Sequence, residues 1–482
     1  MLLNDPTLFR QQACIAGQWC AADSAQTLTV HNPANAEQLG SVPNMGAAET
    51  QRAIHAAHTT LPDWRAKTAA ERAKILRRWF ELILHNQDDL ALLMTLEQGK
   101  PLAEARGEIA YAASFIEWFA EEGKRAYGDT IPSPSSSSRL LVIKQPIGVC
   151  AAITPWNFPA AMITRKAGAA LAAGCTMVIK PASATPFSAL ALMVLAQRAG
   201  IPDGVLSVVT GSAKAIGDEF TSNPLVRKLS FTGSTEVGRH LLRQCADDIK
   251  KVSLELGGNA PFIVFADADL DAAVSGAIAA KFRNAGQTCV CVNRFYVQDA
   301  VYEDFAQRLI TAVEQLRMGD GRSEGVTIGP LINQSAVDKA HVHIKDALEL
   351  GATLECGGKV TEGTFFQPTV LANVPYDALL AREETFAPVA ALMRFNDEQQ
   401  AIQLANDTEF GLAAYFYSQD IGRCFRVSEA LEYGMVGVNT GLISNEVAPF
   451  GGVKASGLGR EGSKYGLDEY LEIKYINFGA IS

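Results

Sequence analysis

Short apolar runs that alternate with helical segments constrain the fold of this chain more than any other feature. Beyond Gly148, the runs most typical of strands are 149–153, 177–179, 206–209, 228–231 and 252–256. Helical stretches such as 160–173 and 187–199 separate them. Parallel strands need crossover connections of this kind, so the alternation predicts an α/β fold in which helices cover both faces of a parallel sheet.

A second series of similar elements begins at Pro261 and continues to about Asn439. The Gly257-Gly258 pair between the two series breaks regular structure, so we expect a domain boundary there. We therefore predict two parallel-sheet α/β domains. The first contains 1–129 and 147–257, with 445–466 returning to it, and the second contains 258–444.

Two strand candidates stand apart from both series. One, 140–146, follows a serine-rich run that is typical of an exposed turn. The other, 470–478, alternates apolar and polar residues near the end of the sequence. We interpret 130–146 and 467–482 as a small β oligomerisation arm whose strands pair across subunits, which would make the protein a homodimer or homotetramer.

The composition is that of a globular enzyme and argues against several other classes. The 482 residues are 48% hydrophobic and 20% charged, with a formal net charge of −10. Without a basic cluster, no nucleic-acid partner is expected. No apolar run approaches the ~20 residues that span a bilayer, and the N-terminus lacks a signal-peptide pattern, so no membrane partner is expected. Nine scattered cysteines without metal-ligand spacing indicate a reducing compartment, hence the cytoplasm, and no metal site.

A candidate for covalent catalysis lies in the run Asn284-Ala-Gly-Gln-Thr-Cys289, where a small turn offers a thiol. A second run, Leu254-Glu255-Leu-Gly-Gly-Asn259, offers a carboxylate at the end of a predicted strand. A thiol nucleophile and a separate carboxylate base suffice for chemistry through a thioester. Glu255 alternates with Leu254 and Leu256, and this pattern by itself would indicate only a surface carboxylate. None of the seven histidines lies near either run, which argues against a papain-like thiol hydrolase.

Three segments are candidates for binding a dinucleotide. The literal G-x-G-x-x-G run, 457–462, lies too close to the end of the sequence to open a βαβ unit, so we interpret it as a glycine-rich loop between domains. The run Phe231-Thr-Gly-Ser234 follows a predicted strand, and Ser234 is a good N-cap for a helix whose free N–H groups can bind phosphate. Lys180 ends another predicted strand, where parallel sheets place ligands, although a lysine there is usually solvated.

Seven motifs in order resemble those of the aldehyde dehydrogenase superfamily, and the resemblance covers nearly the whole chain. They are Thr154-Pro-Trp-Asn-Phe-Pro159, Lys180-Pro-Ala-Ser183, Phe231-Thr-Gly-Ser234, Glu255-Leu-Gly-Gly258, Gly286-Gln-Thr-Cys289, Glu383-Glu-Thr-Phe386 and Pro449-Phe-Gly-Gly452. Within the superfamily the chain is most similar to the succinate-semialdehyde dehydrogenases, on Cys289-Val-Cys291, Asn439-Thr-Gly-Leu-Ile-Ser444 and the 457–462 run. The resemblance implies an NAD(P)-dependent enzyme with the superfamily's fold, whose first domain binds the dinucleotide and whose second domain carries the nucleophile.

By resemblance, Cys289 is the nucleophile that attacks the aldehyde, giving a hemithioacetal and then a thioester. Asn157 and the Cys289 backbone N–H are implied to stabilise the oxyanion, and Glu255 is implied to activate the water that hydrolyses the thioester. Two other classes stay open. One is a CoA-acylating aldehyde dehydrogenase, against which Glu255 argues; the other is a non-catalytic cofactor-binding relative, against which all three residues argue.

The resemblance also assigns cofactor contacts to Thr154, Trp156, Lys180, Ser183, Gly233, Ser234, Leu256, Glu384 and Phe386. NAD-preferring relatives commonly carry Glu at the position of Ser183, where it would repel a 2′-phosphate. Ser183 removes that charge and leaves Lys180 free to pair with the phosphate, so we expect NADP as the preferred cofactor and NAD as the second. Ala387 stands where relatives usually have glycine after this phenylalanine.

The expected substrate is a small semialdehyde with a distal carboxylate. The resemblance places Arg165, Arg283 and Ser444 at that carboxylate, which an arginine fork suits; the alternative is that both arginines are structural. Succinate semialdehyde is the first candidate and glutarate semialdehyde the second, since one methylene changes binding by only ~1–3 kcal/mol. Cys291 is either a packing thiol or a redox partner that forms a regulatory disulfide with Cys289.

Overall fold

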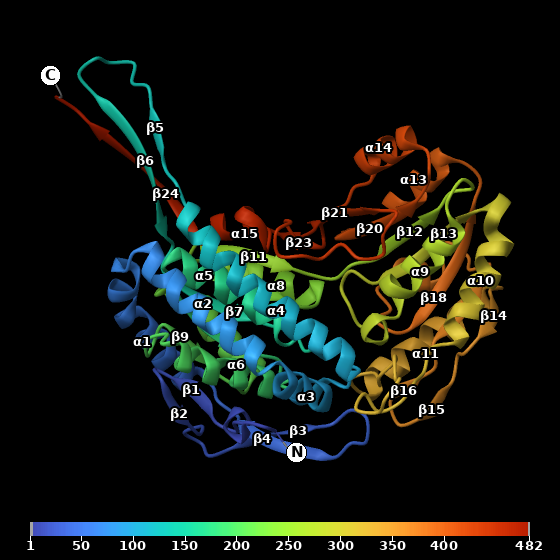
Figure 1. Ribbon diagram of the computed structural model, residues 1–482, viewed down its shortest axis with the longest axis horizontal. Coiled ribbons are helices and arrows are strands. Elements are labelled where there is room, and N and C mark those ends of the chain that lie inside the picture. Colours follow the sequence, from blue (N-terminus) through green and yellow to red (C-terminus); the bar gives the residue numbers. More distant parts are fainter. Residues whose placement is uncertain (1–2, 481–482) are drawn as a thin grey trace.

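The computed structural model describes residues 3–480, which form two α/β bodies and a projecting arm (Figure 1). The first body is built on an eight-stranded sheet in the order β2-β1-β9-β8-β7-β10-β11-β23. Its strands are β1 Ala13–Ile15, β2 Gln18–Cys20, β7 Val149–Ile153, β8 Thr176–Lys180, β9 Leu206–Val208, β10 Val226–Thr232, β11 Lys251–Glu255 and β23 Gly457–Leu458. The strands from β9 to β11 are parallel, and the strands at both edges pair antiparallel.

Helices cover both faces of this sheet because successive side chains of a strand point to opposite sides. Cys150 and Ala152 of β7 join the core under α2 to α6, while Val149 and Ala151 join the core under α1, α7 and α8. The helices are α1 Ala47–Ala66, α2 Ala69–His85, α3 Gln87–Gln98, α4 Leu102–Glu122, α5 Ala161–Ala173, α6 Pro186–Ala199, α7 Ala213–Ser222 and α8 Thr235–Cys245. The prediction of an α/β fold with a parallel sheet is confirmed.

The second body contains a seven-stranded sheet in the order β14-β17-β18-β13-β12-β20-β21, parallel except for β14. Its strands are β12 Ala260–Val264, β13 Val292–Gln298, β14 Thr353–Cys356, β17 Thr369–Ala372, β18 Val389–Phe395, β20 Ala413–Tyr417 and β21 Met435–Val438. Its helices are α9 Leu270–Lys281, α10 Tyr302–Glu314, α11 Gln334–Glu349, α12 Leu379–Arg382, α13 Glu398–Asn406 and α14 Ile421–Ala430. Three two-stranded pairs complete the structure: β3 Thr27–His31 with β4 Gln38–Pro43, β15 Val360–Glu362 with β16 Phe365–Phe366, and β19 Phe410–Gly411 with β22 Val453–Lys454.

The two bodies are connected twice. The chain first passes from β11 to β12 through residues 256–259, which contain the glycine pair. After β21 it returns, so that β22 pairs with β19 of the second body and β23 pairs with β11 of the first. This returning segment covers the edge of the first sheet at the end of β11, where Glu255 lies.

The arm is a three-stranded antiparallel sheet of β5 Asp129–Ile131, β6 Arg139–Pro146 and β24 Leu471–Phe478 (Figure 1). The expectation that its two long strands pair across subunits is wrong. Strand β24 pairs with β6 of the same chain along its whole length, from Leu471 opposite Pro146 to Phe478 opposite Arg139. The two strands pair within one chain because α15 (Ser463–Asp468) packs on α5 and places the start of β24 beside the end of β6. Ile473 and Tyr475 of β24 remain exposed.

Candidate active site

The candidate nucleophile, Cys289, lies in a tight turn between α9 and β13. A single 3-10 turn, Arg283–Gly286, begins it, and Asn284 and Ala285 hold left-handed φ angles of 52° and 54°. Gly286 also has positive φ, and a Cβ there would lie 2.3 Å from the Ala387 carbonyl oxygen, so only glycine fits. A Cβ on Gly258 would likewise meet the Cys289 carbonyl oxygen at 2.4 Å. The glycines of two separate motifs therefore make room for the same turn.

Two cavities meet at Cys289, whose side chain lines both. The first, of about 330 Å³, is lined by Lys100, Glu104, Gly107, Glu108, Tyr111, Phe158, Met162, Arg165, Arg283, Thr288, Cys289, Val290, Ser444 and Phe450. The second, of about 270 Å³, is lined by Pro155, Trp156, Asn157, Met162, Thr232, Gly233, Ser234, Glu255, Leu256, Gly257, Cys289, Lys339, Glu384 and Phe386. A group attached to the Cys289 sulfur is therefore accessible from two sides.

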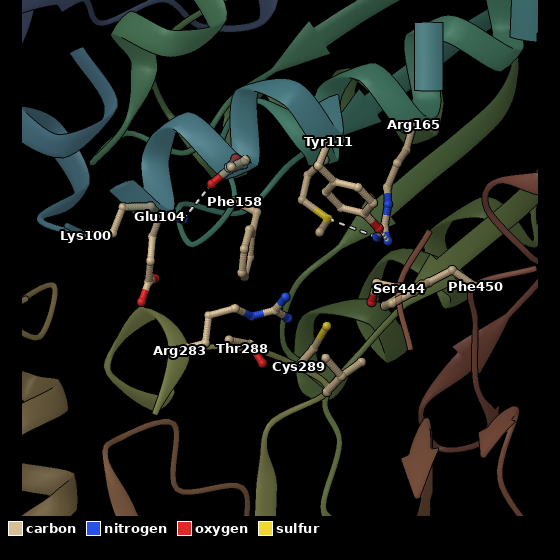
Figure 2. A pocket seen from close by; sticks show the side chains of 14 residues that line it. Lys100, Glu104, Tyr111, Phe158, Arg165, Arg283, Thr288, Cys289, Ser444 and Phe450 are labelled. Atoms are coloured by element: carbon tan, nitrogen blue, oxygen red, sulfur yellow. Dashed lines mark hydrogen bonds and ion pairs between the residues drawn. The ribbon is translucent and has the colours of Figure 1, made fainter. Parts of the chain in front are cut away.

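The two arginines of the first cavity differ in their partners (Figure 2). Arg165 is buried; it donates to the Tyr111 hydroxyl at 2.8 Å, lies 3.5 Å from a Glu461 carboxylate oxygen, and stacks 3.9 Å from the centre of the Phe450 ring. Arg283 contacts the Phe158 ring at 5.4 Å and makes no hydrogen bond or ion pair within residues 3–480. Figure 2 shows its guanidinium directed into the cavity toward Cys289. Arg283 is thus a cation without a counter-ion, as a carboxylate-binding site requires.

The buried setting shifts the pKa values of the two reactive groups. Burial raises the pKa of the Cys289 thiol to about 12, with Arg165 and Arg283 acting in the opposite direction. Burial and the neighbouring Glu461 carboxylate raise the pKa of Glu255 well above its usual range. Neither carboxylate oxygen of Glu255 has a hydrogen-bond partner among the described residues. The strand pattern alone predicted a surface carboxylate, and that is wrong: Glu255 is 2% exposed because the returning segment covers it.

Asn157 approaches the nucleophile turn from the loop that follows β7. Its Nδ2 donates to the Gln287 carbonyl oxygen at 3.1 Å, and its Oδ1 accepts from the Phe158 N–H at 3.1 Å. These two bonds fix which end of the amide faces the turn. One Nδ2 proton remains available to a ligand oxygen at Cys289, so the three residues expected to be catalytic are brought together.

The second cavity contains six of the nine residues expected to contact the cofactor, namely Trp156, Gly233, Ser234, Leu256, Glu384 and Phe386. The Ser234 hydroxyl accepts from the Val237 N–H and caps α8, as its sequence position predicted. Burial raises the pKa of Glu384 to about 7, although its carboxylate accepts from the Gly258 N–H. Phe386 has a left-handed φ of 58°, directly before Ala387.

The other three expected cofactor residues lie outside this lining, at the ends of neighbouring strands. The Thr154 N–H donates to the Lys180 carbonyl oxygen at 3.1 Å, and Ser183 is exposed. Lys180 is not solvated as lysines at strand ends usually are: it is 4% exposed, and burial lowers its pKa to about 8. No carboxylate pairs with it in the described chain.

Sequence reasoning missed a buried ion-pair group behind Glu255. Lys166 of α5 donates to the Thr232 hydroxyl at 2.7 Å and to the Glu461 carboxylate, which also faces Arg165. Glu461 belongs to the glycine-rich 457–462 run that was interpreted only as a loop. The signal was the acidic residue inside that run, but its lysine partner is 295 positions away, so no local pattern connects them.

Cys291 faces away from both cavities. Its thiol donates to the Lys281 carbonyl oxygen at 3.4 Å, and it is buried. Both Cys289 and Cys291 are free thiols. Within residues 3–480 no group of three His, Cys, Asp or Glu side chains is arranged to hold a metal ion, and no helix is long and apolar enough to cross a membrane.

The chain belongs to the aldehyde dehydrogenase family. The model of the family described as "Aldehyde dehydrogenase family" matches residues 19–476. The chain is 71% identical to the NADP(+) succinate-semialdehyde dehydrogenase GabD of Escherichia coli, over 99% of this chain and 100% of that one. It is 70% identical to a glutarate-semialdehyde dehydrogenase of Pseudomonas putida, over 99% of each. A crystal structure of an E. coli NADP-dependent enzyme superimposes with a TM-score of 0.99 at 70% identity, covering 99% of this chain and 100% of that one.

Proposed function

We propose that this protein oxidises succinate semialdehyde to succinate through a thioester on Cys289, with NADP as the preferred cofactor. The observation that carries the proposal is the position of Cys289 between two cavities, one of which holds an arginine without a counter-ion. An aldehyde bound to the sulfur from one side is then open to a hydride acceptor on the other. The activity for which the E. coli relative is named supports the choice of substrate and cofactor.

The residues of the second cavity and the adjoining strand ends fit a phosphorylated dinucleotide. The capped N-terminus of α8 presents free N–H groups, which suit a pyrophosphate. Lys180 is a buried cation without an acidic partner, and exposed Ser183 brings no charge that would repel a 2′-phosphate. A nicotinamide bound there would accept the hydride and would thus be the oxidant of the reaction.

Acylation uses the groups around the nucleophile turn. The Cys289 thiol loses its proton to solvent water, its sulfur forms a bond to the aldehyde carbon, and the carbonyl oxygen becomes an oxyanion. The free Nδ2 proton of Asn157 and the Cys289 backbone N–H stabilise that charge, and each such donor is typically worth ~2.7–4 kcal/mol. Loss of hydride from the same carbon re-forms the carbonyl and leaves a thioester on Cys289.

Deacylation is assigned to Glu255. Burial and the Glu461 carboxylate raise the pKa of Glu255, and a carboxylate with a raised pKa, once ionised, is a stronger proton acceptor than an ordinary one. Glu255 takes a proton from water as the water oxygen bonds to the thioester carbon. The carbon–sulfur bond then breaks, succinate leaves, and Cys289 is reprotonated.

The substrate's distal carboxylate is assigned to Arg283, and Ser444 lines the same cavity. Arg165 lies 3.5 Å from a carboxylate oxygen of Glu461, which Lys166 also contacts, so its contribution is to shape the wall rather than to supply the main charge. Glutarate semialdehyde is the second candidate, because a relative named for that substrate is nearly as similar as the one named for succinate semialdehyde.

The decisive experiment is to quench the protein during turnover of succinate semialdehyde and measure its intact mass. We expect an acyl adduct that peptide mapping places on Cys289, and loss of NADPH formation in Cys289→Ala by on the order of 10⁶-fold. Turnover without an adduct on that residue would contradict the proposal. A panel of four- and five-carbon semialdehydes with NADP and NAD then ranks both substrates and both cofactors by kcat/KM.

The proposal extends to the protein's assembly and setting. Exposed apolar residues on the arm, such as Ile473 and Tyr475, support a homodimer or homotetramer formed through it. Nine free cysteines support a reducing compartment such as the cytoplasm. Sedimentation equilibrium distinguishes the two oligomers.

A further inference from the structure

Three charged residues at one end of the first cavity have no part in the chemistry described so far. Lys100 lies in the turn before α4, and Glu104 and Glu108 lie four positions apart on α4, so they share one face of the helix. All three line the cavity, and Figure 2 shows Lys100 and Glu104 at one end of it. The Lys100 and Glu108 side chains are each 1% exposed and form an ion pair at 2.5 Å.

This ion pair holds the loop that carries Asn157. Lys100 Nζ donates to the backbone carbonyl oxygen of Asn157 at 2.7 Å and lies 4.0 Å from the centre of the Phe158 ring. The second Glu108 oxygen accepts from the N–H groups of Ala160 and Ala161, at the start of α5. The loop between β7 and α5 is therefore fixed at Asn157 and again at its end.

The same face of α4 also holds the nucleophile turn. Glu104 accepts from the N–H of Asn284 at 2.8 Å, and Asn284 Nδ2 donates to the Asn157 carbonyl oxygen at 3.1 Å. The Asn157 carbonyl thus accepts from two donors, one on each side of the boundary between the two bodies. These contacts set the distance between the Asn157 amide and Cys289.

A structural ion pair alone does not account for this placement. Burying two charges usually costs about as much as their attraction returns, and an apolar pair is often as stable. Here Lys100 donates to the backbone carbonyl of Asn157, whose side chain is proposed to bind the oxyanion. A displacement of about 1 Å in a catalytic group typically costs ~10²-fold in rate. Fixing the Asn157 carbonyl should therefore speed turnover by keeping the Asn157 amide in place.

We propose that Lys100 is a positioning residue for oxyanion stabilisation, that it acts through Asn157, and that Glu108 holds it in place. The inference rests on the proposed function, because it requires Asn157 to stabilise the oxyanion. Lys100 itself stays in contact with a backbone carbonyl and Glu108, and does not touch the reacting atoms. Its removal should therefore change the rate of the first chemical step and leave cofactor affinity unchanged.

A double-mutant cycle tests the inference with the full-length protein. The variants are Lys100→Met, Asn157→Ala and the double variant, and the measurement is the single-turnover rate of NADPH formation with saturating succinate semialdehyde. We expect Asn157→Ala to slow this rate by about 10²–10³-fold and Lys100→Met to slow it by about 10–100-fold. In the Asn157→Ala background, Lys100→Met should cost less than about threefold, with the Kd for NADP within about twofold of the parent.

Lys250→Met is the matched control. Lys250 is also buried, donates to two backbone carbonyl oxygens at 2.8 and 3.1 Å, and pairs with Asp248, but it lies away from both cavities. Its removal should leave the single-turnover rate within about twofold, since it contacts neither Asn157 nor the nucleophile turn. If Lys100→Met leaves Glu108 charged and prevents folding, Lys100→Met/Glu108→Gln removes that charge and keeps an acceptor for the α5 N–H groups.

The outcomes separate the two proposals. Full additivity in the cycle, with Asn157→Ala still slow, overturns the positioning role of Lys100 and leaves the proposed function intact. A normal rate in Asn157→Ala overturns the oxyanion assignment, and the positioning role with it. Equal losses in Lys100→Met and Lys250→Met, accompanied by equal losses of thermal stability, mean that Lys100 only supports folding.

Discussion

The two cavities that meet at Cys289 are lined by different kinds of residues. The first is lined by charged and aromatic side chains from α4, α5, the nucleophile turn and residues 444–450. The second is lined by residues of the loop after β7, the start of α8, the end of β11 and residues 384–386, and it includes Gly233 and Gly257. The first cavity offers a cationic side chain to a charged substrate, whereas the second combines backbone at two glycines with side chains such as Glu255. Substitutions in the first cavity should therefore discriminate between aldehydes, and those on the side of the second should change deacylation or the choice of cofactor.

The largest effect is expected for Glu255. Its side chain lines the second cavity, but it acts on the acyl group on Cys289, whose carboxylate end is assigned to the first cavity. Glu255→Gln should slow steady-state turnover by about 10²–10⁴-fold and preserve the first burst of NADPH, because only thioester hydrolysis needs the base. In the parent, the raised pKa of Glu255 means that the base form appears as pH rises, so the steady-state rate should increase with pH. Stopped-flow absorbance at 340 nm across pH measures both; loss of the burst in this variant would contradict the assignment.

The next effect separates the two arginines of the first cavity. Arg283→Ala should lower kcat/KM for succinate semialdehyde by roughly 100-fold, through KM, and change that for butanal little, because a buried charge contact of ~2–5 kcal/mol is lost only for the charged substrate. Arg165→Ala should impair both aldehydes, since it removes the contacts with Tyr111 and Phe450 from the cavity wall and leaves Glu461 with Lys166 as its cationic partner. Equal losses for both aldehydes in Arg283→Ala would remove the basis for a carboxylate site.

On the cofactor side the expected effect is smaller. Ser183→Glu places a carboxylate near Lys180 and should shift the ratio of kcat/KM values from NADP toward NAD by about tenfold, or ~1.4 kcal/mol. Ser137→Glu, in the exposed turn of the arm, adds the same charge far from the cavity and should leave the ratio unchanged. An unchanged ratio in both variants would argue against a 2′-phosphate site at Lys180.

The smallest effect is expected at Cys291, which belongs to neither cavity. Its thiol donates to the Lys281 carbonyl, an arrangement that a packing thiol explains. Cys291→Ser should keep kcat and both KM values within about twofold, with a cost in stability of ~1–3 kcal/mol for burying a hydroxyl. Peroxide inactivation that dithiothreitol reverses in the parent but not in this variant would instead establish a regulatory disulfide with Cys289.

Much of the fold follows from local pattern. The apolar run 149–153 is β7, and the run 228–231 lies within β10, because strands buried on both faces need continuous apolar residues. The arm shows where this reasoning ends. Two of its three strands were predicted, 470–478 from its alternation and 140–146 as the segment that follows the serine-rich run. Their pairing, however, depends on how the chain returns through α15, which no local pattern encodes.

The candidate site divides in the same way. Short motifs with glycine or a reactive side chain drew attention to Cys289, Glu255 and Asn157, and the structure brings these together. Lys100, Glu108 and Lys166 were missed because charged residues in turns and on helices are usually solvated, and their burial appears only when distant segments pack. Glu461 was missed because its run resembled a linker.

The left-handed pair at Asn284 and Ala285 makes one half of the molecule depend on the other. Such conformations cost roughly 1–3 kcal/mol each for residues other than glycine. The Asn284 N–H donates to Glu104, which belongs to the opposite body. A fragment spanning only 258–444 would lack that carboxylate, and its sulfur-bearing turn would be free to relax. We therefore expect the turn that carries Cys289 to become ordered only when the two halves have docked.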